Sequence, residues 1–559
     1  MMRMAISITR MAACLTTAVF AVCYAMSVLS VKRTRSAALL YLLLLLLPVS
    51  YWCTESGFRL DRSASYLTSL FGHPCLTRHP IEVLSNYWTH ELDNMLNRQS
   101  KTVEEAITEY KRRYKRTPPP GFEDWFHYAQ KHNSVIIDDY DSIDSSISSI
   151  RSLTPSQILE AVSSAVSSAD ARLVSYSTAD GAFEGAIFFR WMGEKLTNLF
   201  ADLDQPLPKL SLALNALDEP RVLPDHDQHP PVRWIDQSHQ STWNRTIRDC
   251  SISRSTSKYA HISQAISTQT KLPFIVHAEE AKDLCLHPEY ANMHGVFQSP
   301  ATFIYTDSIL PILSPAKLST FGDILYPPPY YIRAYDQGRY KEEEDPIWEE
   351  KWPQLYWVGS TTGSHATNGG WRSSHRQRFV ARVNQLSNES INFLTEASPG
   401  VWKTFESQDI FSQLYNVKFT RINQCEPEQC DEETAFFQPS SLEGMQEDLK
   451  YRFVFDLDGN SFSGRFYSLL ASRSLVLKQT IFQEWHDERL IPWVHYIPVS
   501  LDMGELPEVM RYFTLTERGA IMAKSIADNG RVWLRKALRK EDASVYMYRL
   551  LLELGRLLE

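Results

Sequence analysis

Several short motifs that mark common enzyme classes are absent from this 559-residue sequence. It contains no G-x-S-x-G, no H-E-x-x-H and no G-x-G-x-x-G pattern, which would indicate an α/β hydrolase, a zinc protease or a dinucleotide-binding domain. The lysine-bearing phosphate loop of Walker-type nucleotide sites is also missing. These absences remove the common hydrolase, zinc-protease and oxidoreductase interpretations.

The sequence also lacks a large excess of charge and has no repeat of fixed period. Its net charge of −9 gives no general nucleic-acid footprint. The hydrophobic fraction of 43% and the charged fraction of 22% are typical of a globular protein. Because 559 residues exceed what one hydrophobic core organises, we expect two domains or more.

Cysteine is scarce, with eight residues in the whole chain. Cys425 and Cys430 in "CEPEQC" suit a small disulfide loop, and Cys250 with Cys285 is a candidate for a second bridge. No further Cys/His pair follows the short loop, so zinc is not predicted there. Disulfides suit a lumenal or extracellular compartment, and two glycosylation triplets fit the same topology: "NRT" at Asn244 and "NES" at Asn388.

The long apolar segments lie at the N-terminus. Residues 11–31 are mostly apolar, and a second run, "SAALLYLLLLLLPVSYW", follows a basic cluster of Lys32, Arg33 and Arg35. A bilayer core needs roughly 20 apolar residues, and basic residues favour the cytosolic side. We therefore predict a transmembrane signal anchor at residues 36–53, with the bulk of the chain in a lumen or outside the cell. A cleaved signal peptide is the alternative, and the role of the first run stays open.

Beyond a stem at residues 54–101, strand-like runs alternate with helical ones, which indicates parallel α/β units. The Ser-rich stretch at residues 142–168 has one apolar helical face and a Thr154 N-cap, so we expect a helix, with a flexible linker as the alternative. The predicted strands are Leu210–Asn215, Pro273–Ala278, Leu355–Ser360, Tyr451–Leu457, Ser474–Gln479 and Trp493–Ser500. The later predicted helices are Arg372–Leu394, Ser463–Ala471, Leu506–Tyr512 and a segment from Thr516 onward.

Two of these strands are followed by loops of small residues and then by arginines. Ligands of open α/β sheets bind beyond the carboxyl ends of the strands. Hydroxyls, backbone N–H groups, a helix start and arginines together suit a phosphate or diphosphate, although a solvated loop before a basic helix is the alternative. The first loop carries Ser360, Thr361, Thr362 and Gly363, followed by Arg372, Arg376 and Arg378. The second carries Asp458, Gly459, Asn460, Ser461, Phe462 and Ser463, followed by Arg465.

Two further acidic features have competing interpretations. Asp456 and Asp458 would suit a divalent metal that holds a diphosphate, but one of the two acids can equally be structural. Asp218 follows the strand that ends at Asn215, and a carboxylate there can act as a general base toward a hydroxyl. Glu219 is the neighbouring alternative. Asp218 can instead cap its turn or pair with Arg221.

The stretch from Tyr451 to Val499 carries a resemblance to a known family. "DLDGNSFSGRFYSLL", "SLVLKQTIFQEWHDERLIPWVHYIPV" and the earlier "YWVGSTTG…WRSSHRQR" closely resemble the fungal capsule-associated-protein glycosyltransferases. These form glycosyltransferase family 90 together with the animal protein O-glucosyltransferases. "EYKRRYKRTPPPGFEDWFHYAQ" and "LNALDEPRVLP" are also similar to the fungal branch. The resemblance covers roughly Thr102 to the C-terminus.

The resemblance implies an α/β fold of GT-B type, in which two Rossmann-like domains face a cleft. The acceptor and catalytic-base domain would span 102–345 and the UDP-sugar-binding domain, with returning C-terminal helices, 346–559; residues 1–35 would be cytosolic or of uncertain role. The implied reaction is inverting transfer from a UDP-sugar without an essential metal or other cofactor. The resemblance thereby disfavours both the metal interpretation of Asp456 and Asp458 and the purely structural one of Asp218.

The resemblance also assigns roles to residues. Asp218 matches the family's catalytic aspartate in an Asn-x-x-Asp turn that begins at Asn215. Ser360 and Arg378, with Arg372 as the rival, match donor-binding positions, as do Asp458 to Ser463 with Arg465. Asp458 stands where animal members carry Arg, which leaves the sugar open. Tyr326 matches an acceptor-side position, and Glu484 and Trp485 either join the donor pocket or pack between strands.

We therefore expect a single-pass type II membrane enzyme of the Golgi or ER in a fungus-like secretory pathway. It would transfer xylose or glucose from a UDP-sugar to a hydroxyl of a glycan or protein, with no nucleic-acid partner. The alternatives are a non-catalytic lumenal sugar-binding protein on the same fold and a metal-dependent transferase that uses the Asp-x-Asp triplet.

Overall fold

The structure is a computed structural model that describes residues 78–559, except for 185–189, 202, 204–206, 226–231, 251–262, 264–265, 269, 332–339, 388, 399 and 445. The predicted anchor, the first half of the predicted stem (residues 54–77) and Asn388 lie outside the described residues. Within the described part of the chain, no helix is long and apolar enough to cross a membrane. Residues 76–559 cluster as one compact unit. We call the described residues before and after 332–339 the first and second halves.

Four helices open the described chain: α4 (Pro80–Asn97), α5 (Val103–Tyr114), α6 (Phe122–Lys131) and α7 (Asp141–Ser146). Part of the predicted stem is instead α4, which belongs to the folded body. Its buried face follows helical spacing through Ile81, Leu84, Trp88, Leu92 and Met95. Thr102 and Glu105 form a capping box that starts α5.

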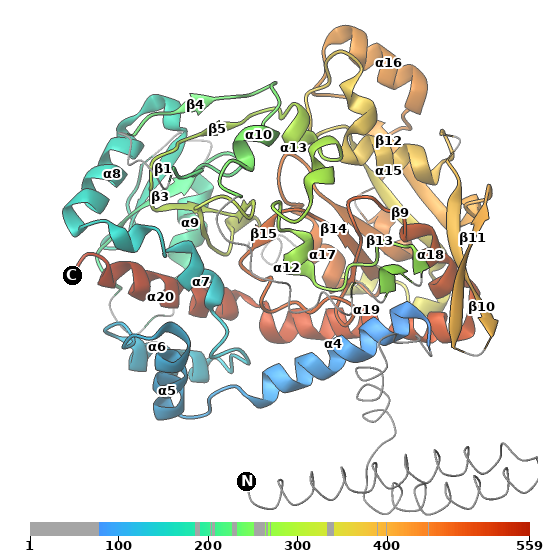
Figure 1. Cartoon of the computed structure of the whole chain (residues 1–559). Coiled ribbons are helices and arrows are strands. Elements are labelled where there is room, and N and C mark those ends of the chain that lie inside the picture. The colour runs from blue at the N-terminus through green and yellow to red at the C-terminus, as the bar shows by residue number, and fades with distance from the viewer. Residues whose placement is uncertain are drawn as a thin grey trace, which may run out of the picture. The chain divides into compact units, whose positions relative to one another are not determined.

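The sheet of the first half has the strand order β2-β1-β3-β6-β8. Its strands are β1 (Leu173–Ser177), β2 (Phe183–Glu184), β3 (Ser211–Asn215), β6 (Ile312–Ser314) and β8 (Ile324–Leu325). β3, β6 and β8 are parallel, whereas β1 is antiparallel to both β2 and β3. The expected parallel arrangement therefore holds for β3, β6 and β8 but is wrong for β1 and β2. The Ser-rich stretch does form a helix, α8 (Pro155–Ser167), capped by Thr154, and it packs against β1 and β3 (Figure 1).

The predicted strand Pro273–Ala278 is wrong. Its last residue begins the short helix α12 (Ala278–Ala281), and the residues before it belong to no strand. Two indole N–H groups occupy its carbonyls, because Trp493 Nε1 donates to Ile275 O at 2.8 Å and Trp88 Nε1 donates to Val276 O at 2.8 Å. The run is apolar because the segment is buried between tryptophans, and burial alone does not distinguish a strand from such a segment.

The sheet of the second half is fully parallel, with the strand order β12-β9-β13-β14-β16. Its strands are β9 (Trp352–Ser360), β12 (Tyr415–Arg421), β13 (Tyr451–Leu457), β14 (Leu475–Gln479) and β16 (Ile497–Pro498). Helices α15 (His375–Val383), α17 (Phe466–Ala471) and α19 (Glu517–Ala537) pack against it or each other. Three of the predicted strands thus form neighbouring central strands of this sheet, and the loops after β9 and β13 leave it at its carboxyl edge.

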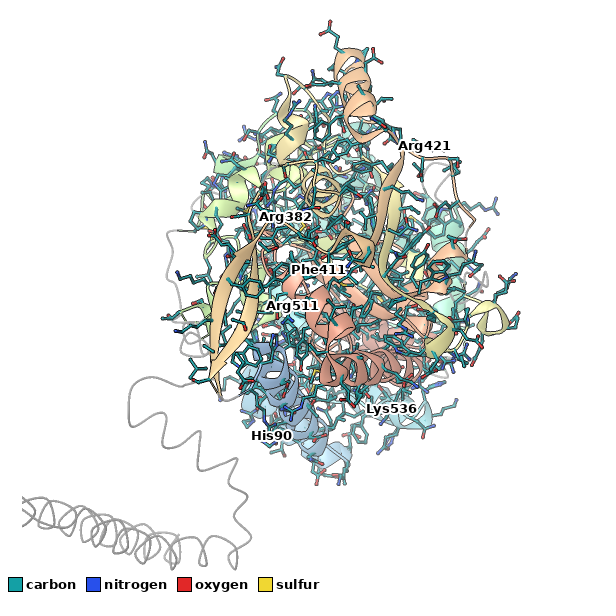
Figure 2. The ribbon with its side chains drawn as sticks, turned by 90° about the vertical axis from the view of Figure 1, so that its right-hand side faces the viewer. His90, Arg382, Phe411, Arg421, Arg511 and Lys536 are labelled. Carbon is teal, nitrogen blue, oxygen red and sulfur yellow. A yellow bond between two sulfur atoms is a disulfide. The ribbon has the colours of Figure 1, made fainter. Side chains whose placement is uncertain are left out.

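The predicted helix Arg372–Leu394 is too long. α15 ends at Val383, Gln385 adopts a left-handed conformation with φ of 53°, and the chain then forms the antiparallel hairpin of β10 (Ile391–Ser398) and β11 (Val401–Ser407). The first helix of the C-terminal series, α18 (Leu506–Leu515), holds this hairpin, because Glu508 accepts from Leu394 N at 3.1 Å and Arg511 donates to Leu394 O at 3.2 Å. Figure 2 shows the hairpin on the outside, with Arg511 labelled beside it.

The chain ends with α20 (Lys540–Arg556), which returns to the first half (Figure 1). It packs against α6 and α9 (Arg190–Leu199). Trp125 Nε1 donates to Val545 O at 2.9 Å, and Tyr110 OH donates to Glu553 at 2.9 Å.

Both predicted disulfides are confirmed, Cys250–Cys285 and Cys425–Cys430. The remaining elements are β4 (Ile235–Asp236), α10 (Trp243–Thr246), α13 (Gly295–Gln298), β5 (Ile304–Tyr305), β7 (Ala316–Lys317), α16 (Pro427–Phe437) and β15 (Gln483–Glu484).

Candidate functional site

The turn after β3 presents Asp218 from the first half. Asn215 fixes this turn, because its side-chain amide donates to Glu219 O at 2.8 Å and its carbonyl oxygen accepts from Leu217 N at 2.9 Å. Arg221 does not pair with Asp218: its guanidinium donates to Asn215 at 3.2 Å and to two backbone carbonyls. The turn therefore holds Asp218 outward, where its side chain is exposed.

The two neighbouring carboxylates have different surroundings. Glu219 is buried, accepts a hydrogen bond from Thr302 Oγ1 at 2.6 Å, and burial raises its pKa to about 8. Crowding by neighbouring atoms also raises the pKa of Asp218, while a hydrogen bond with the Asn460 side chain acts in the opposite direction. Asp218 is thus the carboxylate that a substrate hydroxyl can reach, and a raised pKa makes it a better base.

Asn460 belongs to the loop after β13 and connects three segments. Besides its hydrogen bond with Asp218, its Oδ1 accepts from Gly363 N at 3.1 Å, in the loop after β9. Gly363 has a φ of 110°, and a Cβ there would lie 2.6 Å from the His375 ring and 2.8 Å from Gly459 O. Only glycine fits this position. The predicted base and both predicted donor loops therefore meet at one place.

The loop after β9 is ordered by its own hydroxyls. Thr361 is buried and donates to Asn423 O at 2.8 Å, whereas Ser360 and Thr362 are partly exposed and lie 3.2 Å apart through their hydroxyl oxygens. In the loop after β13, Gly459 N donates to Ser461 O at 2.8 Å, and Ser463 O accepts from Tyr331 OH at 3.2 Å. The Phe462 ring lies 5.5 Å from that of Tyr331.

Arg376 joins the two loops from beneath. This buried side chain donates to Ser360 O at 3.0 Å, to Thr362 Oγ1 at 2.7 Å and to Asp458 O at 2.7 Å. Burial and the nearby positive charge of Arg465 lower its pKa to about 9. Arg465 itself donates to Val358 O at 2.9 Å. Two cations this close repel each other, and an anion such as a diphosphate would relieve the repulsion.

The two arginines that sequence reasoning placed at the donor are held elsewhere. Arg378 donates to Met293 O at 3.2 Å and to Leu501 O at 3.0 Å, and Arg372 pairs with Glu432 at 2.6 Å. Their contact with a donor stays a prediction. Arg376 stands in the same arginine cluster of the sequence, but nothing in the cluster distinguishes it. The distinction depends on which side of α15 faces the loops.

The Asp-x-Asp triplet has protein partners. Asp456 pairs with Lys478 at 2.8 Å, and Lys478 also lies 3.2 Å from Glu484. Asp458 is buried, accepts from Ile481 N at 3.0 Å, and burial raises its pKa to about 6. Among the residues that the structure describes, no group of three or more His, Cys, Asp or Glu side chains could hold a metal ion. The independence from metal stays a prediction.

The remaining predicted positions are internal. Tyr326 is fully buried, so it lies beneath the surface rather than on an exposed wall. Glu484 accepts from Tyr331 OH at 2.5 Å, and the Trp485 ring lies 5.3 Å from that of Tyr546. Of the two interpretations of Glu484 and Trp485, these contacts favour packing.

This geometry defines the class of site. A parallel sheet that carries two small-residue loops and paired arginines at its carboxyl edge suits an anionic, nucleotide-type ligand. A carboxylate from the first half, that of Asp218, lies beside these loops.

Comparison with known proteins names the family. Residues 336–559 match the family model described as "Glycosyl transferase family 90". The chain is 26% identical to "O-glucosyltransferase rumi homolog" of Anopheles gambiae over 268 residues, which are 44% of this chain and 56% of that protein. It is 32% identical to "Protein O-glucosyltransferase 1" of Homo sapiens over 112 residues, 20% of this chain and 27% of that protein.

The chain thus aligns with 56% of the length of the mosquito relative and with 27% of the length of the human one. Its C-terminal part, residues 336–559, belongs to glycosyl transferase family 90, and the chain is related to animal O-glucosyltransferases. The predicted family is confirmed, while its fungal capsule-associated branch stays a prediction. The matched segment contains both donor loops and Arg376, but Asp218 precedes it.

Proposed function

We propose that this chain is an inverting glycosyltransferase that transfers xylose or glucose from a UDP-sugar to a hydroxyl of a glycan or protein. One observation carries the proposal: Asn460 of the predicted donor loop interacts with Asp218 of the other half. A general base and a diphosphate site are the two parts that inverting transfer needs, and they adjoin here. The GT-B arrangement of two facing halves is part of the same proposal.

In the proposed reaction, Asp218 takes the proton of the acceptor hydroxyl while its oxygen attacks the anomeric carbon. The new glycosidic bond forms on the face opposite to UDP, so the configuration inverts as the bond to the diphosphate breaks. Negative charge develops on the leaving diphosphate, and Arg376 and Arg465 supply positive charge beside the loops that would hold it.

No essential metal is included in the proposal. Lys478 already neutralises Asp456, and one oxygen of Asp458 accepts from the Ile481 N–H group. The two arginines would replace the charge that a metal supplies in other transferases.

We also propose a lumenal location in the Golgi or ER, with residues 36–53 as the anchor. The two disulfides support an oxidising compartment. Asn244 in the triplet "NRT" is exposed, as a glycosylation acceptor must be.

The test is UDP release by the full chain with UDP-xylose, UDP-glucose or UDP-galactose, with and without EDTA. Asp218→Asn should abolish release, whereas Asp528→Asn, at an exposed position of α19, should leave it unchanged. Release that survives EDTA supports the proposed mechanism and identifies the donor. Loss of release with EDTA would restore the metal-dependent alternative. UDP binding without release, even when candidate glycan and protein acceptors are added, would indicate a non-catalytic binding protein.

A further inference from the structure

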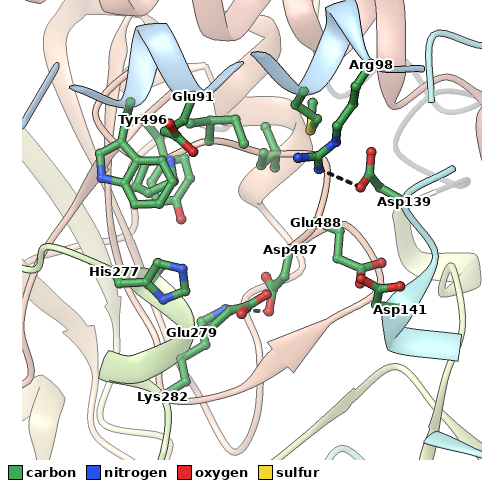
Figure 3. A pocket seen from close by; sticks show the side chains of 16 residues that line it. Glu91, Arg98, Asp139, Asp141, His277, Glu279, Lys282, Asp487, Glu488 and Tyr496 are labelled. Atoms are coloured by element: carbon green, nitrogen blue, oxygen red, sulfur yellow. Dashed lines mark hydrogen bonds and ion pairs between the residues drawn. The ribbon is translucent and has the colours of Figure 1, made fainter. Parts of the chain in front are cut away.

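A cavity of about 340 Å³ lies apart from the proposed donor site (Figure 3). It lies between α4, α12 and the segment at residues 487–496, and none of the predicted site residues lines it. Its volume falls within the range of small-molecule pockets, roughly 300–1,000 Å³. Part of its lining is aromatic or aliphatic: Trp88, Met95, Leu490, Ile491, Pro492 and Tyr496.

The rest of the lining is strongly acidic. Two of its carboxylates have cationic partners in the lining itself, because Arg98 pairs with Asp139 at 2.8 Å and Lys282 pairs with Asp487 at 2.7 Å. The six lining carboxylates are Glu91, Asp139, Asp141, Glu279, Asp487 and Glu488, against the two cations. This excess of negative charge disfavours a phosphate, a diphosphate or any other anion.

Of the other four carboxylates, two are held by residues outside the lining. Asp141 pairs with Arg113 at 3.2 Å. Glu488 accepts from Ser142 N at 2.7 Å, and burial raises its pKa to about 8, so it carries little charge at neutral pH. The Glu279 carboxylate forms no hydrogen bond with another described residue, and Asn94 donates to the Glu91 carboxylate at 3.4 Å. Figure 3 shows Glu91 and Glu279 on opposite sides of the opening. The unbalanced charge is thus carried by two groups that a ligand could bridge.

Tyr496 adds an independent indication of a ligand. Its side chain is only 7% exposed, and its hydroxyl reaches into the cavity (Figure 3). No described residue forms a hydrogen bond with this hydroxyl. A ligand with a hydrogen-bond donor would pair with this hydroxyl.

A metal ion does not fit these groups. Among the described residues, no three His, Cys, Asp or Glu side chains lie close enough together to coordinate one ion. We propose that the cavity binds an organic cation, a protonated amine or guanidinium carried on an apolar stem. Glu91 and Glu279 neutralise the charge, the Tyr496 oxygen accepts one N–H donor, and Met95 and Leu490 contact the stem.

The cation could be a free amine or the side chain of a Lys or Arg residue in a polypeptide. Both sources present the same chemistry to the cavity. Asp141 and Glu279 line the cavity and are exposed to solvent, so a free amine or a polypeptide side chain can enter from this side.

Isothermal titration of the full chain tests the proposal. The probes are cadaverine, the matched neutral pentanediol, and capped Gly-Lys-Gly and Gly-Arg-Gly peptides. Cadaverine should bind and pentanediol should not. Glu279→Gln should weaken binding about tenfold, the size of one charge-assisted hydrogen bond, and Tyr496→Phe should weaken it severalfold. Glu428→Gln, the same charge change at an exposed position of α16, should leave binding unchanged.

Binding of the peptides but not of cadaverine would assign the cation to a polypeptide side chain. Equal binding of pentanediol and cadaverine would overturn the proposal, as would an unchanged affinity in Glu279→Gln. The absence of binding by every cationic probe at millimolar concentration would also overturn it. Because UDP release is measured separately, none of these results depends on the proposed transferase activity.

Discussion

At the scale of single residues, Asn460 links the proposed base to the donor loops. Its hydrogen bond lowers the pKa of Asp218 against the effect of crowding. Asn460→Ala removes that bond, so the pKa of Asp218 should rise, and less of the base should be ionised at a given pH. The acidic limb of the pH profile of kcat/KM for sugar transfer should therefore move to higher pH. Asn423→Ala is the control, because Asn423 contacts Thr361 through its backbone. An acidic limb at the same pH in Asn460→Ala and wild type would contradict the effect of Asn460 on the pKa of Asp218.

Gly363 is a second residue whose identity the geometry determines. A Cβ at this position would lie 2.6 Å from His375 and 2.8 Å from Gly459 O, with φ at 110°. Gly363→Ala should displace one loop from the other and weaken UDP binding at least tenfold, about 1.4 kcal/mol. Gly370→Ala is the matched control, because a Cβ at Gly370 would meet no atom within 4 Å. UDP titration checks both variants, and equal affinities would contradict this account.

The location of the donor arginine shows a limit of sequence reasoning at this scale. Residues 376 and 378 are two positions apart, so on a helix they point to nearly opposite sides. The sequence contains both arginines, but the phase of α15 decides which one faces the loops. Similarly, Asp218 and Glu219 are neighbours, and only the packing of the turn shows which carboxylate is buried.

At the scale of elements, the predictable strands are those that burial on both faces makes continuously apolar. β9, β13 and β14 were predictable for this reason. The hairpin β10–β11 was not, because its run began within an apparently helical pattern and depends on Glu508 and Arg511 of a distant helix. α4 was missed because polar and charged residues separate its apolar ones, although the buried residues keep helical spacing.

The returning helix α20 gives an element-scale prediction. Leu550 is a fully buried residue of α20, the helix that packs against α6 and α9 of the first half. Leu550→Ala leaves a cavity there and should lower the free energy of unfolding by roughly 2–5 kcal/mol. Val532→Ala removes similar apolar atoms from a position of α19 that is 63% exposed. This control should change the free energy of unfolding by less than about 0.5 kcal/mol. Urea unfolding measures both, and equal effects would mean that α20 does not stabilise the body.

At the scale of the whole molecule, a buried histidine pair joins the two halves behind the donor loops. His294 precedes α13 in the first half, His375 begins α15 in the second, and their rings stack at 3.8 Å. His375 lies 2.9 Å from Asp458 O through Nε2. Burial lowers the pKa of His294 to about 3 and that of His375 well below its usual value, with Arg376 acting in the same direction. Both rings are therefore neutral in the folded protein at neutral pH.

This pair should make the folded protein sensitive to acid. The unfolded chain binds protons at these histidines below about pH 6.5, whereas the folded chain does not until much lower pH. The stability contribution is therefore complete above pH 6.5 and is lost as the pH falls toward 3, by up to about 1.4 kcal/mol per pH unit for each histidine. His294→Phe should reduce the slope of stability against pH in this range, whatever its effect at pH 7.5. The exposed His90→Phe should leave the slope as in the wild type. Thermal melts from pH 7.5 to 5 measure these slopes. Equal slopes for His294→Phe and wild type would mean that the histidine pair does not make the stability of the protein depend on pH.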